Sequence, residues 1–196
     1  MRRTERYTAT FNKNKTEQKH INSVIFKIYE WAGTFVSSFI IVFVLLAFVF
    51  RIASVSGESM VPTLDDGNRL VVSNLNSNYE YGDIVVVSQP NYLNENLIKR
   101  VIAVGGDTVD IDFEKGIVYI NEKKIDEPYI NTLTNYEPPD SVKFPLVVPQ
   151  GYLFVMGDNR NASLDSRSQS IGLIDERYIF GKAYFRILPF GEWGIY

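Results

Sequence analysis

The feature that most constrains this chain is a run of nineteen residues without a charge, from Ala32 to Phe50. As a helix it would extend roughly 28 Å at 1.5 Å per residue, close to the hydrocarbon thickness of a bilayer. The apolar region of a cleaved signal peptide is shorter, about 7–15 residues. We therefore expect an uncleaved transmembrane helix over 32–50, with cleavage among the small residues at 53–57 as the alternative.

Charge is distributed unequally on the two sides of this run. Residues 1–31 carry seven Lys and Arg against three acids, whereas residues 51–196 carry thirteen against twenty. Because cationic flanks stay on the cytoplasmic side, we expect a cytoplasmic basic tail over 1–31, a single-pass cell-membrane location and an extracellular domain over 51–196. The lipid bilayer is thus an expected partner, and the net charge of −3 argues against nucleic acid.

The histidine and cysteine content limits the chemistry that this domain can perform. The chain has no cysteine, and its single histidine, His20, lies before the apolar run. Thiol nucleophiles are therefore excluded, and the main domain cannot contain a histidine-based triad or a histidine metal site. A hydrolase here must use another base, and we expect neither a metal nor a cofactor.

The rest of the chain has the pattern of a β-rich domain. Short β-branched runs, bounded by Gly, Asn, Asp or Pro, occur at 69–73, 83–88, 97–104, 108–112, 116–120, 152–156 and 181–188. Gly116 between two such runs indicates a hairpin, and residues 175–179 could form a short helical turn. Residues 131–149 contain four prolines and indicate a loop or part of an insert. The expected fold class is mostly β.

Three short segments contain side chains suited to hydrolysis, and the first is SGESMVPTL at residues 56–64. Gly57 permits unusual backbone angles and Pro62 fixes the chain, on either side of Ser59. Such a turn can present the serine hydroxyl and its own backbone N–H to a substrate. A polar linker that follows the membrane is the alternative interpretation of this segment alone.

The second segment is LIKRVIAV at residues 97–104. On a strand, Lys99 shares a face with Leu97 and Val101, whereas Arg100 lies on the other face. A lysine on an apolar face is desolvated, so we expect its pKa to fall from ~10.4 toward neutrality, which would make it a general base. The alternative is that both cations snorkel from an edge strand.

The third segment is GDNRNASLDSR at residues 157–167, directly after an apolar run. Asp165 and Arg167 could pair and brace this loop, and Ser163 could orient a neighbouring amine. A solvated loop is the alternative. A calcium loop is less suitable, because Arg160 stands where a third ligand would be needed and no bidentate glutamate follows.

Together with YGDIVVV at 81–87, IKRV at 98–101 and GD at 106–107, these segments and the apolar run resemble the type I signal peptidase family, especially its short Gram-positive form. The resemblance covers nearly the whole chain after residue 31. It implies a membrane-bound serine endopeptidase that removes N-terminal signal peptides from exported precursor proteins. Ser59 would be the nucleophile, and Lys99, neutral at rest, would be the general base.

The resemblance also implies roles for the surrounding residues. Ser163 would help to position the Lys99 amine, while Asp165 and Arg167 would hold the third segment against the dyad. Part of the oxyanion would be held by the backbone N–H of Ser59. Substrate would bind as an added strand, in small apolar pockets that select residues such as Ala. These pockets would be lined by Val55, Met60, Leu64, Leu97 and Ile98.

The fold that the resemblance implies is an antiparallel β catalytic domain. Its core would cover about 53–106 and 150–196, around a small β insert near 107–149. Two other functions fit parts of the pattern. A pilus assembly factor could keep the fold with few or no cleavage substrates, and a self-cleaving repressor peptidase shares the chemistry but needs a DNA-binding N-terminal domain. Contact with the export machinery stays open.

Overall fold

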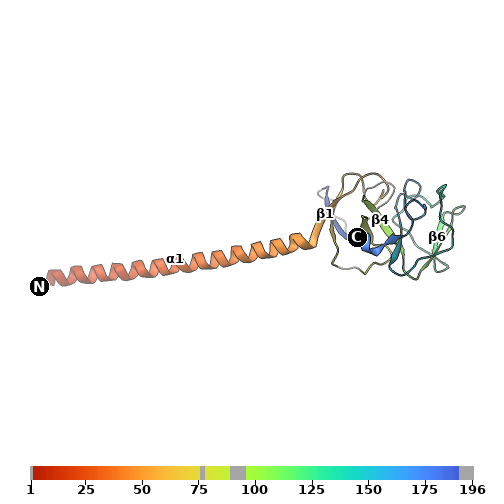
Figure 1. The fold of residues 1–196 in the computed structure, drawn as a ribbon. Coiled ribbons are helices and arrows are strands. Elements are labelled where there is room, and N and C mark those ends of the chain that lie inside the picture. Colours follow the sequence, from red (N-terminus) through yellow and green to blue (C-terminus); the bar gives the residue numbers. More distant parts are fainter. Residues whose placement is uncertain (1, 76–77, 89–95, 190–196) are drawn as a thin grey trace. The chain divides into compact units, whose positions relative to one another are not determined.

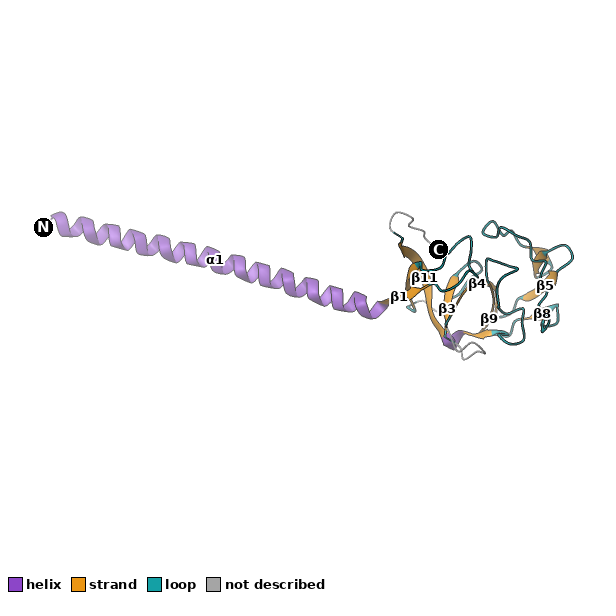
Figure 2. Ribbon diagram, turned by 90° about the horizontal axis from the view of Figure 1, so that it is seen from above, coloured by secondary structure: helices purple, strands orange, loops and turns teal. Residues whose placement is uncertain are grey.

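The computed structural model describes residues 2–75, 78–88 and 96–189, and their side chains apart from residues 2–21 and 24. The chain divides into two units, Met1–Phe48 and Val49–Tyr196, which are described separately. The first is helical (Figure 1) and the second is built from strands (Figure 2).

The helical unit is a single α-helix, α1, from Arg2 to Val49 (Figure 1). The sequence predicts a helix only over 32–50, and both ends differ in the structure. The helix begins thirty residues earlier because the charged N-terminal residues include no proline, and Gly33 is the first glycine. It ends one residue earlier because Phe50 already belongs to a strand.

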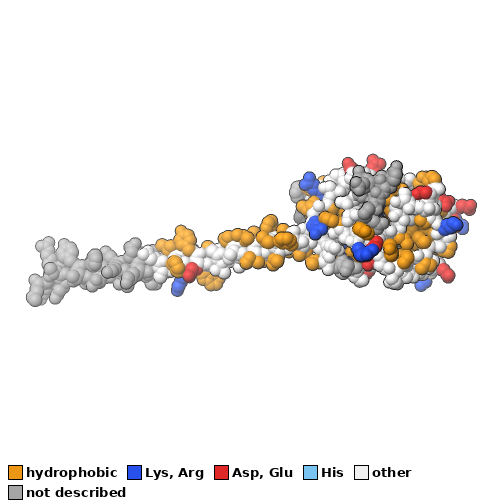
Figure 3. All heavy atoms as spheres, in the orientation of Figure 1, with side chains coloured by type: hydrophobic (Ala, Val, Ile, Leu, Met, Phe, Trp, Pro, Cys, Tyr) orange, Lys and Arg blue, Asp and Glu red, His pale blue; other side chains and the backbone are white. Residues whose placement is uncertain are grey.

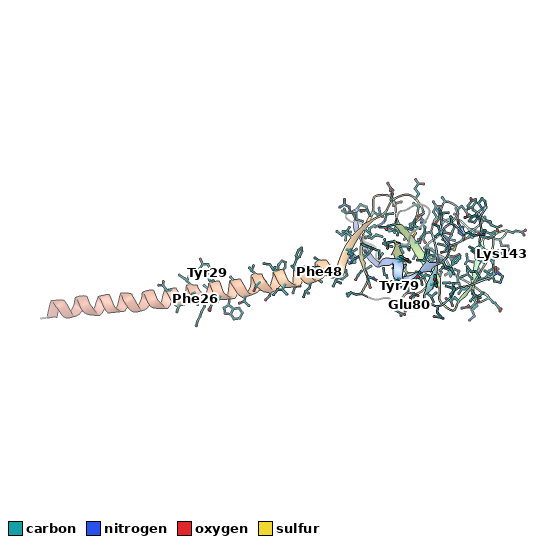
Figure 4. The ribbon with its side chains drawn as sticks, in the orientation of Figure 1. Phe26, Tyr29, Phe48, Tyr79, Glu80 and Lys143 are labelled. Atoms are coloured by element: carbon teal, nitrogen blue, oxygen red, sulfur yellow. The ribbon has the colours of Figure 1, made fainter. Side chains whose placement is uncertain are left out.

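Within α1, residues Ile25–Val49 are long and apolar enough to cross a membrane by length and composition. Their side chains point outward around the helix, as Phe26, Tyr29 and Phe48 do in Figure 4. Figure 3 shows hydrophobic side chains gathered along this segment. A helix that is apolar on all sides and covered by no other part of its own unit is typical of a membrane span.

The second unit contains two antiparallel sheets, which confirms the expected mostly β fold. The larger sheet has the order β1-β2-β11-β3-β4-β9-β10 and the smaller one β7-β6-β5-β8 (Figure 2). The strands are β1 Phe50–Ser54, β2 Arg69–Ser73, β3 Ile84–Val87, β4 Leu97–Val104, β5 Thr108–Asp112, β6 Ile117–Ile120, β7 Lys123–Lys124, β8 Leu146–Val147, β9 Tyr152–Met156, β10 Ile174–Asp175 and β11 Ile179–Leu188.

All seven predicted strands are present, four of them with the predicted ends and three within two residues. The hairpin between β5 and β6 turns through Gly116, whose φ of 67° explains the glycine there. The predicted helical turn is a 3-10 helix, η1, at Glu176–Tyr178. Four strands were not predicted: β1 continues directly from the apolar helix, and β7, β8 and β10 have only two residues each.

Strand β4 lies in the middle of the larger sheet, between β3 and β9. Seven of its eight residues are buried, so the alternative that its cations snorkel from an edge strand is wrong. On one face Ile98 packs in a cluster with Met60 and Leu64. On the other face Leu97 and Val101 pack in a cluster with Leu153 and Ile174. Strand β4 is therefore held by both neighbouring strands and by core residues on its two faces.

Candidate active site

The predicted nucleophile and base meet in this structure. Ser59 lies in the turn that follows β1, and Lys99 is the third residue of β4. The Nζ atom of Lys99 donates a hydrogen bond to the Oγ atom of Ser59 over 2.7 Å. This distance is short enough for direct proton transfer from the hydroxyl to a neutral amine.

Lys99 is buried without a carboxylate partner. Only 3% of its surface is exposed, and none of the described acidic side chains lies within salt-bridge distance of its amine. Burial lowers the pKa of Lys99 to about 8; the negative charge of Asp165 opposes this shift, and the positive charge of Arg167 adds to it. The neutral amine is therefore favoured at lower pH than for an ordinary lysine, and a Lys99 that is neutral at rest stays a prediction.

Two residues of the third segment fix the backbone of the nucleophile. Asn159 donates from its side chain to the carbonyl oxygen of Glu58 over 3.1 Å, and from its backbone to that of Ser59 over 3.0 Å. Gly157 leaves the space for this approach, because a Cβ there would lie 2.4 Å from the Ser59 oxygen and 2.3 Å from the Ser163 hydroxyl. The sequence did not single out Gly157 or Asn159, although the Gly-Asp-Asn-Arg motif contained both.

The backbone N–H of Ser59 donates to no acceptor in the part of the chain that the structure describes. It is therefore open to an oxygen of a bound substrate. Gly57, two residues earlier, has a φ of 82°, which favours glycine. Its own N–H donates to Asp66 over 2.8 Å. The turn thus leaves one backbone donor at the nucleophile and engages the other.

Asp165 and Arg167 form the pair that the sequence predicts. The guanidinium donates to both carboxylate oxygens, over 2.8 and 2.9 Å, and both side chains are fully buried. Burial alone would raise the pKa of Asp165, but the hydrogen bonds and charge of Arg167 lower it below its usual value. Asp165 also accepts from the backbone N–H of Gly157 over 3.0 Å. The pair therefore braces the segment that holds the nucleophile.

Ser163 makes no hydrogen bond to the lysine amine in this structure, and its role in positioning that amine stays a prediction. Its Oγ atom is buried and makes no hydrogen bond of good geometry with any described residue. The hydroxyl is nevertheless close enough to Asp165 to help lower the pKa of that carboxyl. The Lys99 amine donates its hydrogen bond to Ser59, and an ammonium has further N–H donors that could reach another hydroxyl.

A second buried pair occupies the opposite face of β4. Arg100 donates from Nε and Nη2 to the two oxygens of Asp158, over 2.8 and 2.6 Å. Asp158 also accepts from the Thr63 hydroxyl over 2.5 Å, which ties this pair to the serine turn. Sequence reasoning missed the pair because its members are 58 residues apart.

A hollow of about 180 Å³ opens around the dyad. Four of the five predicted pocket residues line it, namely Val55, Met60, Leu97 and Ile98. The fifth, Leu64, does not line this hollow: it is fully buried and packs in the same core cluster as Met60, and its part in substrate binding stays a prediction. Leu164, which was not predicted, adds a fifth apolar side chain, and Ser54, Ser56 and Asn96 add polar ones. A larger hollow of about 300 Å³ lies in the smaller sheet, but it contains neither the serine nor the lysine, so we place the site at the smaller one.

The geometry is that of a serine and a lysine that share a hydrogen bond beside a hollow lined by both apolar and polar side chains. Among the described residues, no group of three or more acidic or histidine side chains is placed to hold a metal ion. The arrangement can deprotonate a hydroxyl, and it can present that hydroxyl to a carbonyl group with one backbone N–H nearby.

Comparison with known proteins identifies the family. The family described as signal peptidase, peptidase S26, matches residues 28–188. Signal peptidase I of Bacillus licheniformis is 36% identical over 185 residues, which covers 90% of this chain and 97% of the relative. Signal peptidase IB of Staphylococcus aureus strain COL is 36% identical over 182 residues, which covers 85% of this chain and 92% of the relative.

The crystal structure of a signal peptidase I from Enterococcus faecalis V583 has 27% identity and a TM-score of 0.42, and it covers 53% of this chain and 95% of its own. The chain thus belongs to the signal peptidase family, peptidase S26, and it is a hydrolase of the signal peptidase I type.

Proposed function

We propose that this chain is a membrane-bound endopeptidase that cleaves N-terminal signal peptides from exported precursor proteins with a dyad of Ser59 and Lys99. The observation that carries the proposal is the 2.7 Å hydrogen bond from a buried lysine without a carboxylate partner to a serine, beside a hollow whose walls include Val55, Met60, Leu97 and Ile98. The lowered pKa of Lys99 supplies the neutral fraction that a general base requires.

In the first half-reaction, neutral Lys99 takes the hydroxyl proton as Ser59 Oγ bonds to the carbonyl carbon at the cleavage site. The carbonyl electron pair moves to its oxygen, which accepts a hydrogen bond from the Ser59 backbone N–H. Collapse of this intermediate breaks the C–N bond, and the Lys99 ammonium gives its proton to the leaving amine. The mature protein departs, and the signal peptide stays bound as an ester on Ser59.

In the second half-reaction, Lys99 deprotonates a water molecule that attacks the ester. The C–O bond to Ser59 then breaks, and the proton returns from Lys99 to the serine oxygen. Ser163, whose hydroxyl is buried near Asp165, would hold the amine once the serine is acylated. Asp165 and Arg167 act indirectly, because their pair holds Gly157 against the nucleophile.

The substrate would bind in extended form in the hollow around the dyad. Pockets for small side chains one and three positions before the cut would be formed by Val55, Met60, Leu64, Leu97 and Ile98. Main-chain pairing with an added strand suits substrates of varied sequence. The walls are buried side chains of a packed core, which leave room for alanine but not for larger residues.

The division of the chain follows the same proposal. Residues 1–31 would be a cytoplasmic tail, 32–50 the membrane anchor and 51–196 the extracellular peptidase domain. Within that domain, the catalytic core would cover about 53–106 and 150–196, and the insert about 107–149. The anchor would hold the dyad near the bilayer, where a signal peptide emerges from its own apolar segment.

The cleavage reaction can be tested with the purified full chain in detergent micelles. A secretory precursor whose signal ends in Ala-X-Ala should be cut after the second alanine, as N-terminal sequencing of the product would show. If no precursor is cut under conditions where the protein is folded, the assembly-factor function is favoured and the peptidase proposal fails.

The orientation can be tested separately in spheroplasts. Protease added outside should digest residues 51–196 and spare the basic tail. Recovery of a mature form that begins near Gly57 would show that the apolar segment is removed and is not an anchor.

A further inference from the structure

Two hollows of the second unit meet at one leucine. Leu164, 37% exposed, lines the dyad hollow and also a neighbouring hollow of about 330 Å³. We call the latter the Tyr136 hollow. Besides Leu164, its wall includes Tyr136, Pro138, Pro139 and Ser163. The proposed mechanism leaves this second hollow without a role, although it begins where the dyad hollow ends.

Hydrogen bonds hold the Tyr136 side of this hollow in place. The Tyr136 N–H donates to the Asn161 side chain over 3.1 Å, and its carbonyl oxygen accepts from Arg167 over 3.3 Å. Both hydrogen bonds are made by the backbone of Tyr136. They fix the position of this residue and leave its ring half-exposed. The hollow is therefore present before any substrate binds.

The opposite wall is fixed through Asp140. Its carboxylate accepts from the Ser168 hydroxyl over 2.5 Å and from the Ser170 N–H over 3.1 Å. These hydrogen bonds keep the pKa of Asp140 below its usual value. The wall is thus tied to the same loop that carries Arg167.

The direction of a bound chain follows from the lining of the dyad hollow. Its remaining wall is formed by the end of β1, the serine turn that follows it and the start of β4, including Val55 and Ile98. In the proposed function that side receives the signal peptide. The substrate residues after the scissile bond must then extend in another direction. Leu164 lines both hollows, so these residues would enter the Tyr136 hollow.

The alternation of side chains in an extended peptide selects one residue of that leaving chain. Residues one and three before the cut face the protein, so the first residue after the cut faces away and the second faces the protein again. Its Cα lies about 7 Å beyond that of the residue before the cut. That spacing fits a second hollow directly next to the first.

We propose that the Tyr136 hollow is a specificity subsite for the second residue after the scissile bond, and that it favours a large apolar or aromatic side chain there. This inference rests on the proposed function, because it needs a peptide cleaved at Ser59. The hollow is larger than the dyad hollow, 330 against 180 Å³. The Tyr136 ring and two prolines offer the apolar and aromatic surface that such a side chain would bury.

The test compares two peptides that share a signal ending in Ala-X-Ala and differ only in Phe or Ala at the second position after the cut. The full chain in detergent micelles should cleave the Phe peptide with a kcat/KM about tenfold higher, the usual order for one apolar side chain in a pocket. Tyr136→Ala should reduce this ratio to about one. Tyr178→Ala, which removes another exposed tyrosine (41%) that lines neither hollow, should leave the ratio unchanged.

A second variant tests the same subsite by a gain of preference. Tyr136→Glu should favour a peptide with Lys at the second position over one with Glu, because the new carboxylate would face that side chain. Equal cleavage of the Phe and Ala peptides by the unmodified protein, or a ratio that persists in Tyr136→Ala, would overturn the subsite while leaving the peptidase intact. If neither peptide is cut by the unmodified protein, the proposed function fails first.

Discussion

The two faces of strand β4 each carry a buried cation, and these two neighbouring cations have different partners. Lys99 is 3% exposed and contacts the Ser59 hydroxyl, whereas Arg100 is 7% exposed and shares two hydrogen bonds with Asp158. Burial is nearly equal, so burial alone does not decide the role of a cation. A buried ammonium without a carboxylate partner has a lowered pKa, so its neutral form becomes available to accept a proton. A buried guanidinium that is paired with a carboxylate stays charged and stabilises the fold through that pair.

The comparison depends on a carboxylate that is kept away from the lysine. The negative charge of Asp165 would raise the pKa of Lys99, but Arg167 binds both oxygens of that carboxylate and its positive charge acts in the opposite direction. The pair therefore keeps Lys99 unpaired in addition to bracing the loop. Two arginines thus engage the carboxylates nearest the dyad, Asp158 and Asp165, and the lysine is left with the serine.

The largest effect is expected from the face that carries the dyad. Ser59→Ala and Lys99→Ala should each lower kcat/KM for a precursor by at least about 10³-fold, since members of a nucleophile–base pair act as a unit. Lys99→Arg should fail equally, because a guanidinium stays charged and cannot accept the proton. Quenched assays of purified full-length variants would measure this.

The double variant Ser59→Ala/Lys99→Ala is the matched control for that experiment. It should be no slower than either single variant, since the second change removes a group that has already lost its partner. Turnover by either alanine variant within about tenfold of the unmodified protein would remove the dyad from the mechanism.

Much of this fold could be predicted from local patterns. The limits of β4, β5 and β9 were found because β-branched runs end at Gly, Asn, Asp or Pro. The start of α1 was missed because charged residues without proline or glycine suit a helix as well as a tail. Strand β1 was missed because its apolar residues continue the membrane segment without a boundary signal, and it becomes a strand only by pairing with β2.

The candidate site divides in a similar way. The burial of Lys99 could be predicted from alternation along one strand, and the Asp165–Arg167 pair from its two-residue spacing. The partner of Arg100 could not be predicted, because Asp158 comes from a segment 58 residues away. The full burial of Leu64 could not be predicted, because closeness in sequence to the serine does not reveal which side of a turn faces the core. These contacts depend on how strands are ordered in the sheet, which no local pattern contains.

The next largest effect is expected from breaking the pair on the other face. Asp158→Ala would leave the Arg100 charge buried and unpaired, so the free energy of unfolding should fall by about 3–5 kcal/mol. Urea unfolding followed by circular dichroism would measure it. Asp112→Ala is the matched control, because it removes the carboxylate of an ion pair whose lysine is 70% exposed. The control should lower the free energy of unfolding far less. Equal decreases in both variants would show that the buried pair stabilises the fold no more than an exposed pair does.

The pH dependence of kcat/KM should follow the titration of Lys99. In the proposed mechanism the neutral amine is the active form, so kcat/KM should rise about tenfold per pH unit and level off near pH 8, where the pKa of Lys99 lies. His20→Gln is the control, since it removes the single histidine and should leave the profile unchanged. A profile that still rises at pH 10 would mean that Lys99 is not desolvated.

Stability should follow the same group. The pKa of Lys99 is about 8 in the folded protein against 10.5 as the ordinary value, so between these pH values the unfolded chain binds more protons. Stability should therefore increase with pH across that window, by about 3 kcal/mol in total for this group. Lys99→Met should lack that increase when urea unfolding is compared at pH 7.5 and pH 10, and an unchanged increase would assign it to another group.

The smallest effect is expected from an aromatic ring that touches only the paired face. The guanidinium carbon of Arg100 lies 4.1 Å from the centre of the Tyr129 ring, and that of Arg160 lies 5.8 Å away. Tyr129→Leu removes a partly desolvated cation–π contact and should lower the free energy of unfolding by about 1–2 kcal/mol. Tyr129→Phe keeps the ring and loses the hydroxyl contact with Tyr81 at 3.0 Å, so it should lower the free energy of unfolding by less.

Neither change should move the pH at which kcat/KM levels off, because Tyr129 stacks on Arg100 rather than on the lysine. If Tyr129→Leu does shift that pH, the two faces of β4 are electrostatically coupled. The roles of Lys99 as a base and of Arg100 as a structural cation would then not be independent.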